Sequence, residues 1–117
     1  MVGARPNFVK MAPILRALEA YPDVHSVLIH TGQHYDTSLS DVFFQELTLP
    51  EPDHHLDVGS GSHATQTGRI MERFEELMVA EANADRPFDL VLVVGDVNST
   101  FACTVVAAKA NVLVAHV

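Results

Sequence analysis

Four short apolar runs along the chain have the composition of buried strands. The two clearest are Asp89–Val94 (DLVLVV) and Asn111–Val117 (NVLVAHV), which are rich in β-branched residues. Val24–His30 (VHSVLIH) is bounded by turn residues, and the weaker candidate His54–Val58 (HHLDV) precedes a Gly-Ser-Gly-Ser stretch. The apolar positions are continuous rather than alternating, which is typical of strands covered on both faces in a parallel sheet.

Helical periodicity fills the segments between these runs. The first apolar stripe consists of Phe8, Met11, Leu15 and Leu18. Pro13 lies within this stripe and is expected to kink or restart the helix, because proline lacks a backbone N–H. Three more helices are predicted further along the chain, at Asp36–Leu47, His63–Asn83 and Asn98–Lys109.

Strands that alternate with helices predict an α/β fold with a doubly wound parallel sheet. The 117 residues suffice for one such domain with a modest core. A turn at Gly3–Asn7 should follow a strand, and only Met1 and Val2 precede this turn. We therefore expect the first strand, which is central in such a sheet, to be truncated here and to leave its neighbours without a partner.

Polar and glycine residues gather in the loops that follow the predicted strands. These loops are Gly3–Asn7, Thr31–Asp36, Gly59–His63 and Gly95–Thr100. The opposite loops, such as AYPD and ADRPFD, are plain connections. Doubly wound sheets bind ligands at the carboxyl ends of their strands, and glycine lets the backbone approach a phosphate closely. The one-sided distribution therefore predicts a ligand site at this edge of the sheet.

Three charged residues in these loops and in the first helix are candidates for ligand chemistry. Arg5 offers a planar fork for phosphate oxygens and Lys10 a point charge, although Arg5 could instead pair with a carboxylate elsewhere. Asp96 follows a strand at the rim of the sheet, where burial would suit it to proton transfer. Alternatively, Asp96 or one of the residues 98–100 caps the helix that begins near Asn98.

Several other classes of site are excluded or disfavoured. The chain has neither GxGxxG nor GxxxxGK[ST], so the dinucleotide fingerprint and the P-loop are both absent. Its seven histidines are scattered, and His54 and His55 would point to opposite faces of a strand, which argues against a zinc site. His34, in a loop beside Gln33, is the exception by position. Cys103, in an apolar helix, is predicted to be a core thiol.

Charge and hydropathy narrow the range of partners. Fifteen acidic against seven basic residues give a formal net charge of −8, which argues against nucleic-acid binding. No apolar run is long enough for a membrane helix, and the start of the chain does not resemble a signal peptide. A single cysteine fits a reducing cytoplasm. We therefore expect a cytoplasmic protein, and the negative net charge does not exclude a small anionic ligand.

Four motifs carry a resemblance to a known family. GARPNFVKMAPIL, TGQHYD, VGSGSHATQT and LVLVVGDVNST, in this order and spacing, resemble the non-hydrolysing UDP-N-acetylglucosamine 2-epimerases over essentially all of the chain. The resemblance implies a Rossmann-like domain, the N-terminal half of a two-domain fold of the glycosyltransferase-B type. Residues 1–117 would be this domain, truncated at its first strand and without the C-terminal nucleotide-binding domain.

The same resemblance implies roles for individual residues. Arg5 and Lys10 match residues that face the diphosphate of the nucleotide sugar, and Asp96 matches a carboxylate required for catalysis. Gln33 and His34 match a pair that helps to bind a regulatory UDP-N-acetylglucosamine in some members. A further arginine of that regulatory site has no counterpart, and the Gly59–His63 loop stands in its place.

The reaction implied is inversion at C2, which interconverts UDP-N-acetylglucosamine and UDP-N-acetylmannosamine by elimination and re-addition of UDP. It requires no nicotinamide cofactor and no obligatory metal, and full-length members are expected to form homodimers. We expect the fragment alone to be inactive and only marginally stable. Two alternatives remain: a hydrolysing relative that releases N-acetylmannosamine, and a non-catalytic domain that binds nucleotide sugars.

Overall fold

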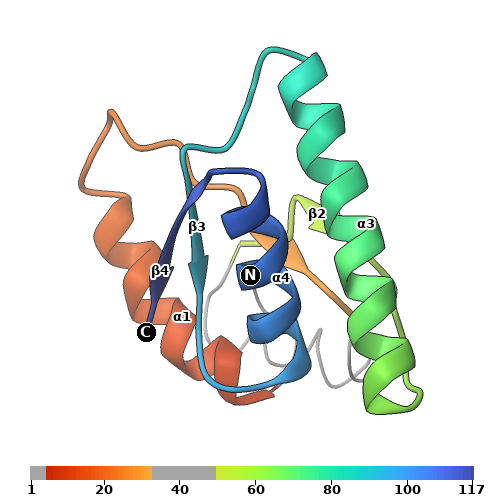
Figure 1. The fold of residues 1–117 in the computed structure, drawn as a ribbon. Coiled ribbons are helices and arrows are strands. Elements are labelled where there is room, and N and C mark those ends of the chain that lie inside the picture. The colour runs from red at the N-terminus through yellow and green to blue at the C-terminus, as the bar shows by residue number, and fades with distance from the viewer. Residues whose placement is uncertain (1–4, 33–49) are drawn as a thin grey trace.

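The computed structural model describes residues 5–32 and 50–117. Its elements, in chain order, are α1 (Arg5–Leu18), β1 (Ile29–His30), β2 (His54–His55), α3 (His63–Asn83), β3 (Leu90–Val93), α4 (Asn98–Lys109) and β4 (Leu113–His116) (Figure 1). The predicted helix at 36–47 lies outside the described residues. From β2 onward, strands and helices alternate as the hydrophobic pattern predicts.

The first helix, α1, differs from the prediction in two respects. It begins at Arg5, within the segment expected to be a loop, and it continues through Pro13 to Leu18 as one helix. Pro13 is exposed, and so is Val9, whose carbonyl would otherwise accept the missing N–H. The proline is tolerated because this side of the helix faces solvent, where water can satisfy that carbonyl.

The helices α3 and α4 have the bounds predicted from their sequences. Ser62 caps α3, since its Oγ accepts a hydrogen bond from the backbone N–H of Thr65 at 3.1 Å. Cys103 on α4 is fully buried, and this burial raises the pKa of its thiol to about 12. The prediction of a core thiol is therefore confirmed.

All four strands are shorter than the apolar runs that predicted them. The run 24–30 forms a strand only at its end, because residues 24–26 are exposed and the carboxylate of Asp53 accepts the N–H of Leu28 at 2.7 Å. In β2 the two histidines lie on opposite faces, as predicted. The His54 side chain approaches Glu81 of α3, whereas the ring of His55 lies 5.7 Å from that of His30.

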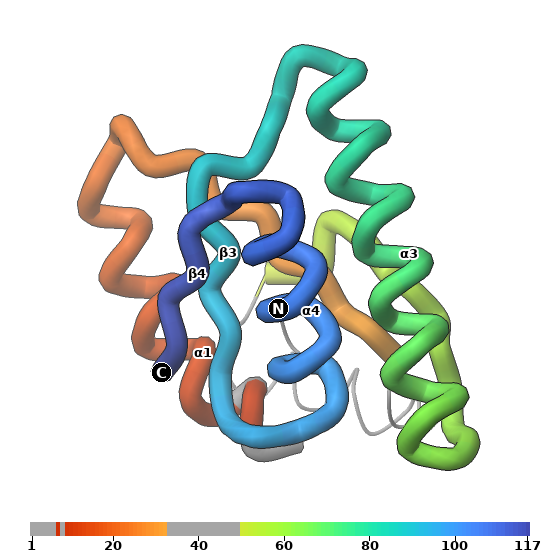
Figure 2. Tube along the Cα trace, viewed as in Figure 1, coloured from red at the N-terminus to blue at the C-terminus, as the bar shows by residue number. Residues whose placement is uncertain are grey.

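The described strands form two parallel pairs rather than one sheet. Ile29 and His30 pair with His54 and His55, and β3 pairs with β4 from Leu90 opposite Leu113 onward. No Cα atom of β1 lies within 8 Å of a Cα atom of β3. Both pairs nevertheless lie between the same two layers of helices, as the ribbon and the trace show (Figures 1 and 2).

The layers follow from the alternation of side chains along each strand. Val91 and Val93 of β3 face α3 and α4 in a core that also holds Phe74 and Ile70. Val94 faces the other way, toward Met11 and Leu15 of α1 in a second cluster. Helices therefore cover both faces of the strands, and the predicted α/β fold is confirmed.

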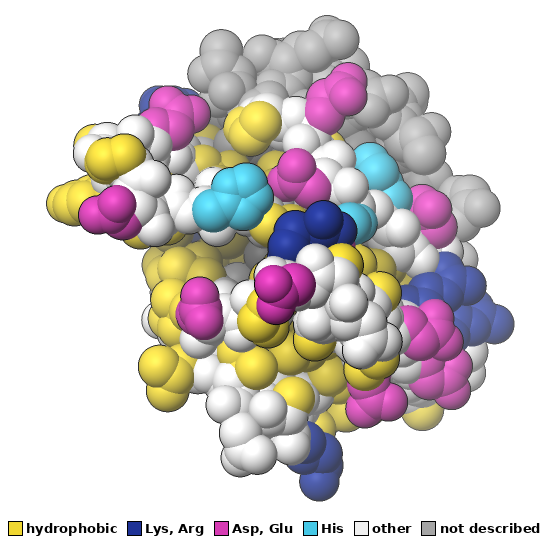
Figure 3. Space-filling model, turned by 90° about the horizontal axis from the view of Figure 1, so that it is seen from above, with side chains coloured by type: hydrophobic (Ala, Val, Ile, Leu, Met, Phe, Trp, Pro, Cys, Tyr) yellow, Lys and Arg dark blue, Asp and Glu magenta, His cyan; other side chains and the backbone are white. Residues whose placement is uncertain are grey.

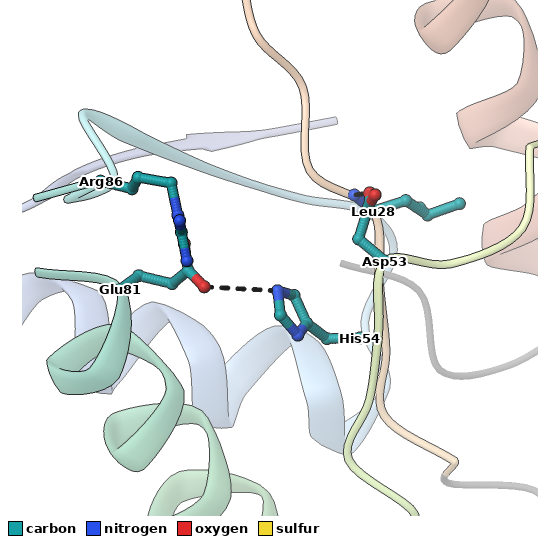
Figure 4. A network of polar contacts seen from close by, with 5 residues as sticks. All are labelled: Leu28, Asp53, His54, Glu81 and Arg86. Carbon is teal, nitrogen blue, oxygen red and sulfur yellow. Dashed lines mark hydrogen bonds and ion pairs between the residues drawn. The ribbon is translucent and has the colours of Figure 1, made fainter. Parts of the chain in front are cut away.

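Charged side chains form a network at the edge where the strands begin (Figure 4). The carboxylate of Glu81 accepts a hydrogen bond from Arg86 Nε at 3.0 Å and lies 3.6 Å from His54 Nε2. The Arg86 hydrogen bond lowers the pKa of Glu81, although burial acts in the opposite direction.

Within residues 5–32 and 50–117, no helix is long and apolar enough to cross a membrane.

Candidate functional site

The loops at the carboxyl ends of β1 and β3 are joined by a buried hydroxyl pair. Thr31 directly follows β1, and Ser99 lies in the first turn of α4 behind β3. Their Oγ atoms are 2.8 Å apart, and both residues are almost fully buried. This contact brings the ends of the two strand pairs to one edge of the molecule, which is the edge predicted to bind the ligand.

The start of α1 is held at the same edge by Asn7. This residue is 1% exposed, and its Nδ2 donates to the carbonyl of Val94 at 3.1 Å. Gly95 follows with φ +76°, a conformation that glycine adopts without steric cost. A Cβ atom at Gly95 would lie 3.0 Å from Asn7 Nδ2, so the close approach of helix and loop depends on this glycine.

Gln66 connects the loop after β2 to the loop after β3. Its Nε2 donates to the carbonyl of Gly59 at 2.9 Å, and its Oε1 accepts from Asn98 Nδ2 at 2.7 Å. Asn98 Nδ2 also lies 3.1 Å from Nδ1 of His63. The buried amide of Gln66 thus sets the relative position of two of the predicted ligand loops. Its hydrogen bonds to Gly59 and Asn98 involve no charged group.

Asp96 projects from the loop between β3 and α4. The residue is exposed, so the burial expected for it is wrong. The capping alternative is also wrong, because the N-cap of α4 is Val97, with no side-chain cap hydrogen bond. The backbone before Asp96 is fixed, since the carbonyl of Gly95 lies 2.7 Å from Nε2 of His116. An exposed carboxylate on a fixed loop is free to reach a bound molecule.

The other predicted site residues are only partly described. Arg5 is the first residue of α1, at the ligand edge, but its side chain lies outside the described part. Lys10 is exposed on α1, one to two turns further along. Gln33 and His34 lie outside the described residues, directly after Gly32. The structure therefore brings the helix start and Asp96 to one edge and leaves the residues 33–34 undescribed.

His30 is a buried titratable group beside this edge. Burial, and secondarily the nearby His55, lower its pKa to about 4, whereas Asp57 acts in the opposite direction. Its Nδ1 accepts the backbone N–H of Gly32 at 2.9 Å, so the ring is neutral and its Nδ1 carries no proton at neutral pH. His30 therefore acts as a hydrogen-bond acceptor that shapes the Gly32 turn.

Sequence reasoning missed Asn7 and Gln66, which hold the loops together. For Gln66 a signal was present, because it lies four residues before Ile70 on the buried stripe of α3, where an apolar residue is expected. Nothing in the sequence marks Asn7 in this way. Among the described residues, no group of three potential metal ligands lies close together.

Comparisons with known proteins identify the family. The family model of UDP-N-acetylglucosamine 2-epimerase matches residues 16–117. A UDP-N-acetylglucosamine 2-epimerase homolog of Methanococcus maripaludis is 44% identical over the whole chain, which covers 31% of that protein. A UDP-2,3-diacetamido-2,3-dideoxy-D-glucuronate 2-epimerase of Pseudomonas aeruginosa is 38% identical over the whole chain, which covers 32% of it.

Solved structures agree with this result. The UDP-GlcNAc 2-epimerase of Methanocaldococcus jannaschii, crystallised with UDP-GlcNAc and UDP, superposes with a TM-score of 0.88 at 42% identity. The match covers 98% of this chain and 30% of that one. The chain thus spans about a third of the length of the relatives it matches. From the family model, the relatives and the shared fold, the chain belongs to the UDP-N-acetylglucosamine 2-epimerase family.

Proposed function

We propose that this chain forms the N-terminal part of an isomerase active site that interconverts UDP-N-acetylglucosamine and UDP-N-acetylmannosamine. The observation that carries the proposal is the match of nearly the whole chain to an epimerase structure that contains UDP-GlcNAc and UDP. The described geometry supports it, because the glycine loops and the start of α1 meet at one edge of the molecule. This edge suits a ligand with an anionic diphosphate.

Within this proposal, Arg5 and Lys10 bind the diphosphate and Asp96 takes part in proton transfer at C2 of the sugar. The cations stabilise the negative charge that develops on the departing UDP. Asp96 is exposed on a loop with a fixed backbone, so its carboxylate can approach a sugar bound across the edge. Gln33 and His34, which directly follow Gly32 in the sequence, contribute to binding of a nucleotide sugar.

The test uses the natural full-length polypeptide that contains these residues. In deuterated water with UDP-N-acetylglucosamine, we expect deuterium to enter C2 and UDP-N-acetylmannosamine to form, as followed by NMR. Asp96→Asn should lower kcat by at least about 10²-fold, the usual range for loss of a general acid or base. Asp89→Asn is a matched control, because Asp89 is exposed at the other end of the same strand.

Other results would replace the proposal. Release of free N-acetylmannosamine and UDP would identify a hydrolysing enzyme, and binding without isotope exchange would identify a non-catalytic domain. The relative from Pseudomonas aeruginosa supports a second substrate, a UDP-2,3-diacetamido uronate, which the same assay tests directly. Formation of a homodimer and a cytoplasmic location, both expected from the resemblance, belong to this proposal and are measured by sedimentation and cell fractionation.

A further inference from the structure

His116 is a polar residue at the end of an otherwise apolar strand. β4 pairs with β3 in parallel, and the register places His116 opposite Val93. Val114 of β4 packs against the larger hydrophobic cluster, and His116, two residues later, lies on the same face of the strand. The register therefore places an imidazole beside the loop that leads from β3 into α4.

The peptide that joins Val94 to Gly95 is held from both sides. Its carbonyl accepts hydrogen bonds from Asn7 Nδ2 at 3.1 Å and from Thr100 Oγ1 at 2.8 Å. Its N–H donates to the carbonyl of Val117 at 3.1 Å. These contacts fix the chain as far as Gly95, but they do not set the orientation of the peptide that follows.

The next peptide joins Gly95 to Asp96, and His116 holds it. Nε2 of His116 lies 2.7 Å from the carbonyl oxygen of Gly95. Gly95 has φ +76°, and because glycine has no Cβ, the peptide after it can rotate with little steric cost. Such a rotation would change the direction in which the Asp96 side chain leaves the loop. The hydrogen bond from His116 therefore selects one direction for the carboxylate.

The same hydrogen bond specifies where the ring of His116 carries a proton. A carbonyl oxygen can accept but cannot donate, so Nε2 must be protonated. The neutral Nε2–H tautomer and the imidazolium both meet this requirement, so the contact does not depend on the charge of the ring. His30 differs, because its Nδ1 accepts the N–H of Gly32 and must be unprotonated.

We infer that His116 is a positioning residue for the proposed isomerisation, which acts through the Gly95 carbonyl to direct the carboxylate of Asp96 toward C2 of the sugar. The inference rests on the proposed role of Asp96 in proton transfer. A general acid or base must lie within hydrogen-bond reach of the proton that it moves, so misdirection of the carboxylate slows the chemical step. Binding of the diphosphate by Arg5 and Lys10 should change little.

The test compares two variants of the natural full-length polypeptide. His116→Leu removes the donor, whereas His116→Gln retains an N–H donor on the side chain. We expect His116→Leu to lower kcat for UDP-N-acetylglucosamine by about tenfold, with KM changed by less than about twofold. Deuterium incorporation at C2 should fall by the same factor as kcat. His116→Gln should recover kcat to within about threefold of the parent enzyme.

The matched control replaces a histidine at the opposite edge. His25 is exposed and lines a groove where the strands begin. Figure 3 shows that edge of the molecule, with a hollow lined by hydrophobic side chains and charged side chains around it. His25→Leu makes the same chemical change as His116→Leu without altering the Asp96 loop, so it should retain the kcat of the parent enzyme.

Nitrogen-15 NMR of the ring of His116 tests the hydrogen bond independently of catalysis. In the neutral ring we expect the proton on Nε2 and none on Nδ1. A proton on Nδ1, parent kcat in His116→Leu, or equal losses of kcat in the Leu and Gln variants would each overturn the inference. If His116→Leu does not fold, the kcat of His116→Gln and the position of the ring proton decide.

The variant Asp96→Asn separates this inference from the proposed function. Loss of activity in Asp96→Asn together with parent activity in His116→Leu would overturn the positioning role and leave the proposed function intact. Parent activity in Asp96→Asn would instead overturn the catalytic role on which the positioning role depends.

Discussion

The two edges of the strand pairs are held together by different chemistry. At the carboxyl edge the connections are buried hydrogen bonds between neutral groups. They are made by the hydroxyls of Thr31 and Ser99 and by the amides of Asn7 and Gln66. At the amino edge the central connection is an ion pair between Glu81 and the largely exposed Arg86. Hydrogen bonds between neutral groups position the predicted ligand loops without adding a fixed charge to them. The charge at the carboxyl edge therefore comes from the side chains predicted to bind the ligand.

The largest expected effect is on the pH dependence of the carboxyl edge. The pKa of His30 is lowered from 6.5 to about 4 in the folded state, so below pH 6.5 the unfolded state binds the additional proton. Its contribution to stability is complete above pH 6.5 and is lost as the pH falls toward 4. Between pH 7 and pH 4.5 this loss should reach roughly 2–3 kcal/mol in chemical denaturation.

Two variants isolate this contribution. His30→Gln removes the titration, so its free energy of unfolding should fall less steeply with acid than that of the parent chain. His25→Gln is the control, because His25 is exposed, and it should retain the parent slope. Identical slopes in all three proteins would show that the burial of His30 has no energetic consequence.

The next effect concerns the buried amide that connects two ligand loops. Gln66→Leu leaves the carbonyl of Gly59 and the amide of Asn98 without this partner, which should cost about 1–3 kcal/mol of unfolding free energy. Glu72→Leu, at an exposed position of the same helix, should stay within about 0.5 kcal/mol. Urea denaturation of both variants makes the comparison, and a neutral Gln66→Leu would contradict the proposed connection.

A glycine pair tests the close approach of α1 to the loop after β3. Gly95→Ala places a Cβ atom 3.0 Å from Asn7 Nδ2 at a positive φ, and we expect a loss of about 1–2 kcal/mol. Gly68→Ala lies in the interior of α3 with no atom within 4 Å of the added Cβ, so it should gain about 0.5–1 kcal/mol. Opposite signs in thermal unfolding would support the steric argument, and equal signs would refute it.

The smallest effect is expected at the ionic edge. Arg86→Met removes the hydrogen bond to Glu81, but the Arg86 side chain is 66% exposed, so solvent screens the pair. The decrease in Tm should be smaller than for Gln66→Leu and should shrink further in 1 M salt. The lowered pKa of Glu81 stabilises the fold above pH 4.5, and this term is lost at lower pH. A larger decrease than for Gln66→Leu would reverse the ranking of the two edges.

Elements defined by local pattern were predicted well. The helices α3 and α4 have the predicted bounds. In α3 this agreement has a local cause, because a long apolar stripe and the cap at Ser62 both lie within the segment itself. The strand at 24–30 was predicted too long, because the carboxylate of Asp53 takes the N–H of Leu28. How far a strand extends depends on the segments that lie beside it in space, and the sequence of the strand itself does not contain this information.

In the candidate site, too, local sequence features were predictable and features that depend on distant contacts were not. Asp96 was predicted as a candidate because glycine and a carboxylate follow an apolar run, which is a local signal. Its exposure and the N-cap at Val97 depend on how α4 starts. The role of Asn7 rests on a hydrogen bond to Val94, 87 residues away in sequence. No pattern within one segment predicts such a contact, so the role of Asn7 could not be predicted from the sequence.

The buried thiol of Cys103 is a chemical probe of the packing around α4. It is the single cysteine of the chain, and its raised pKa and complete burial protect it from alkylation while α4 is packed. Labelling then proceeds only in molecules in which α4 has transiently separated from the core. Its rate under native conditions therefore measures the frequency of this opening.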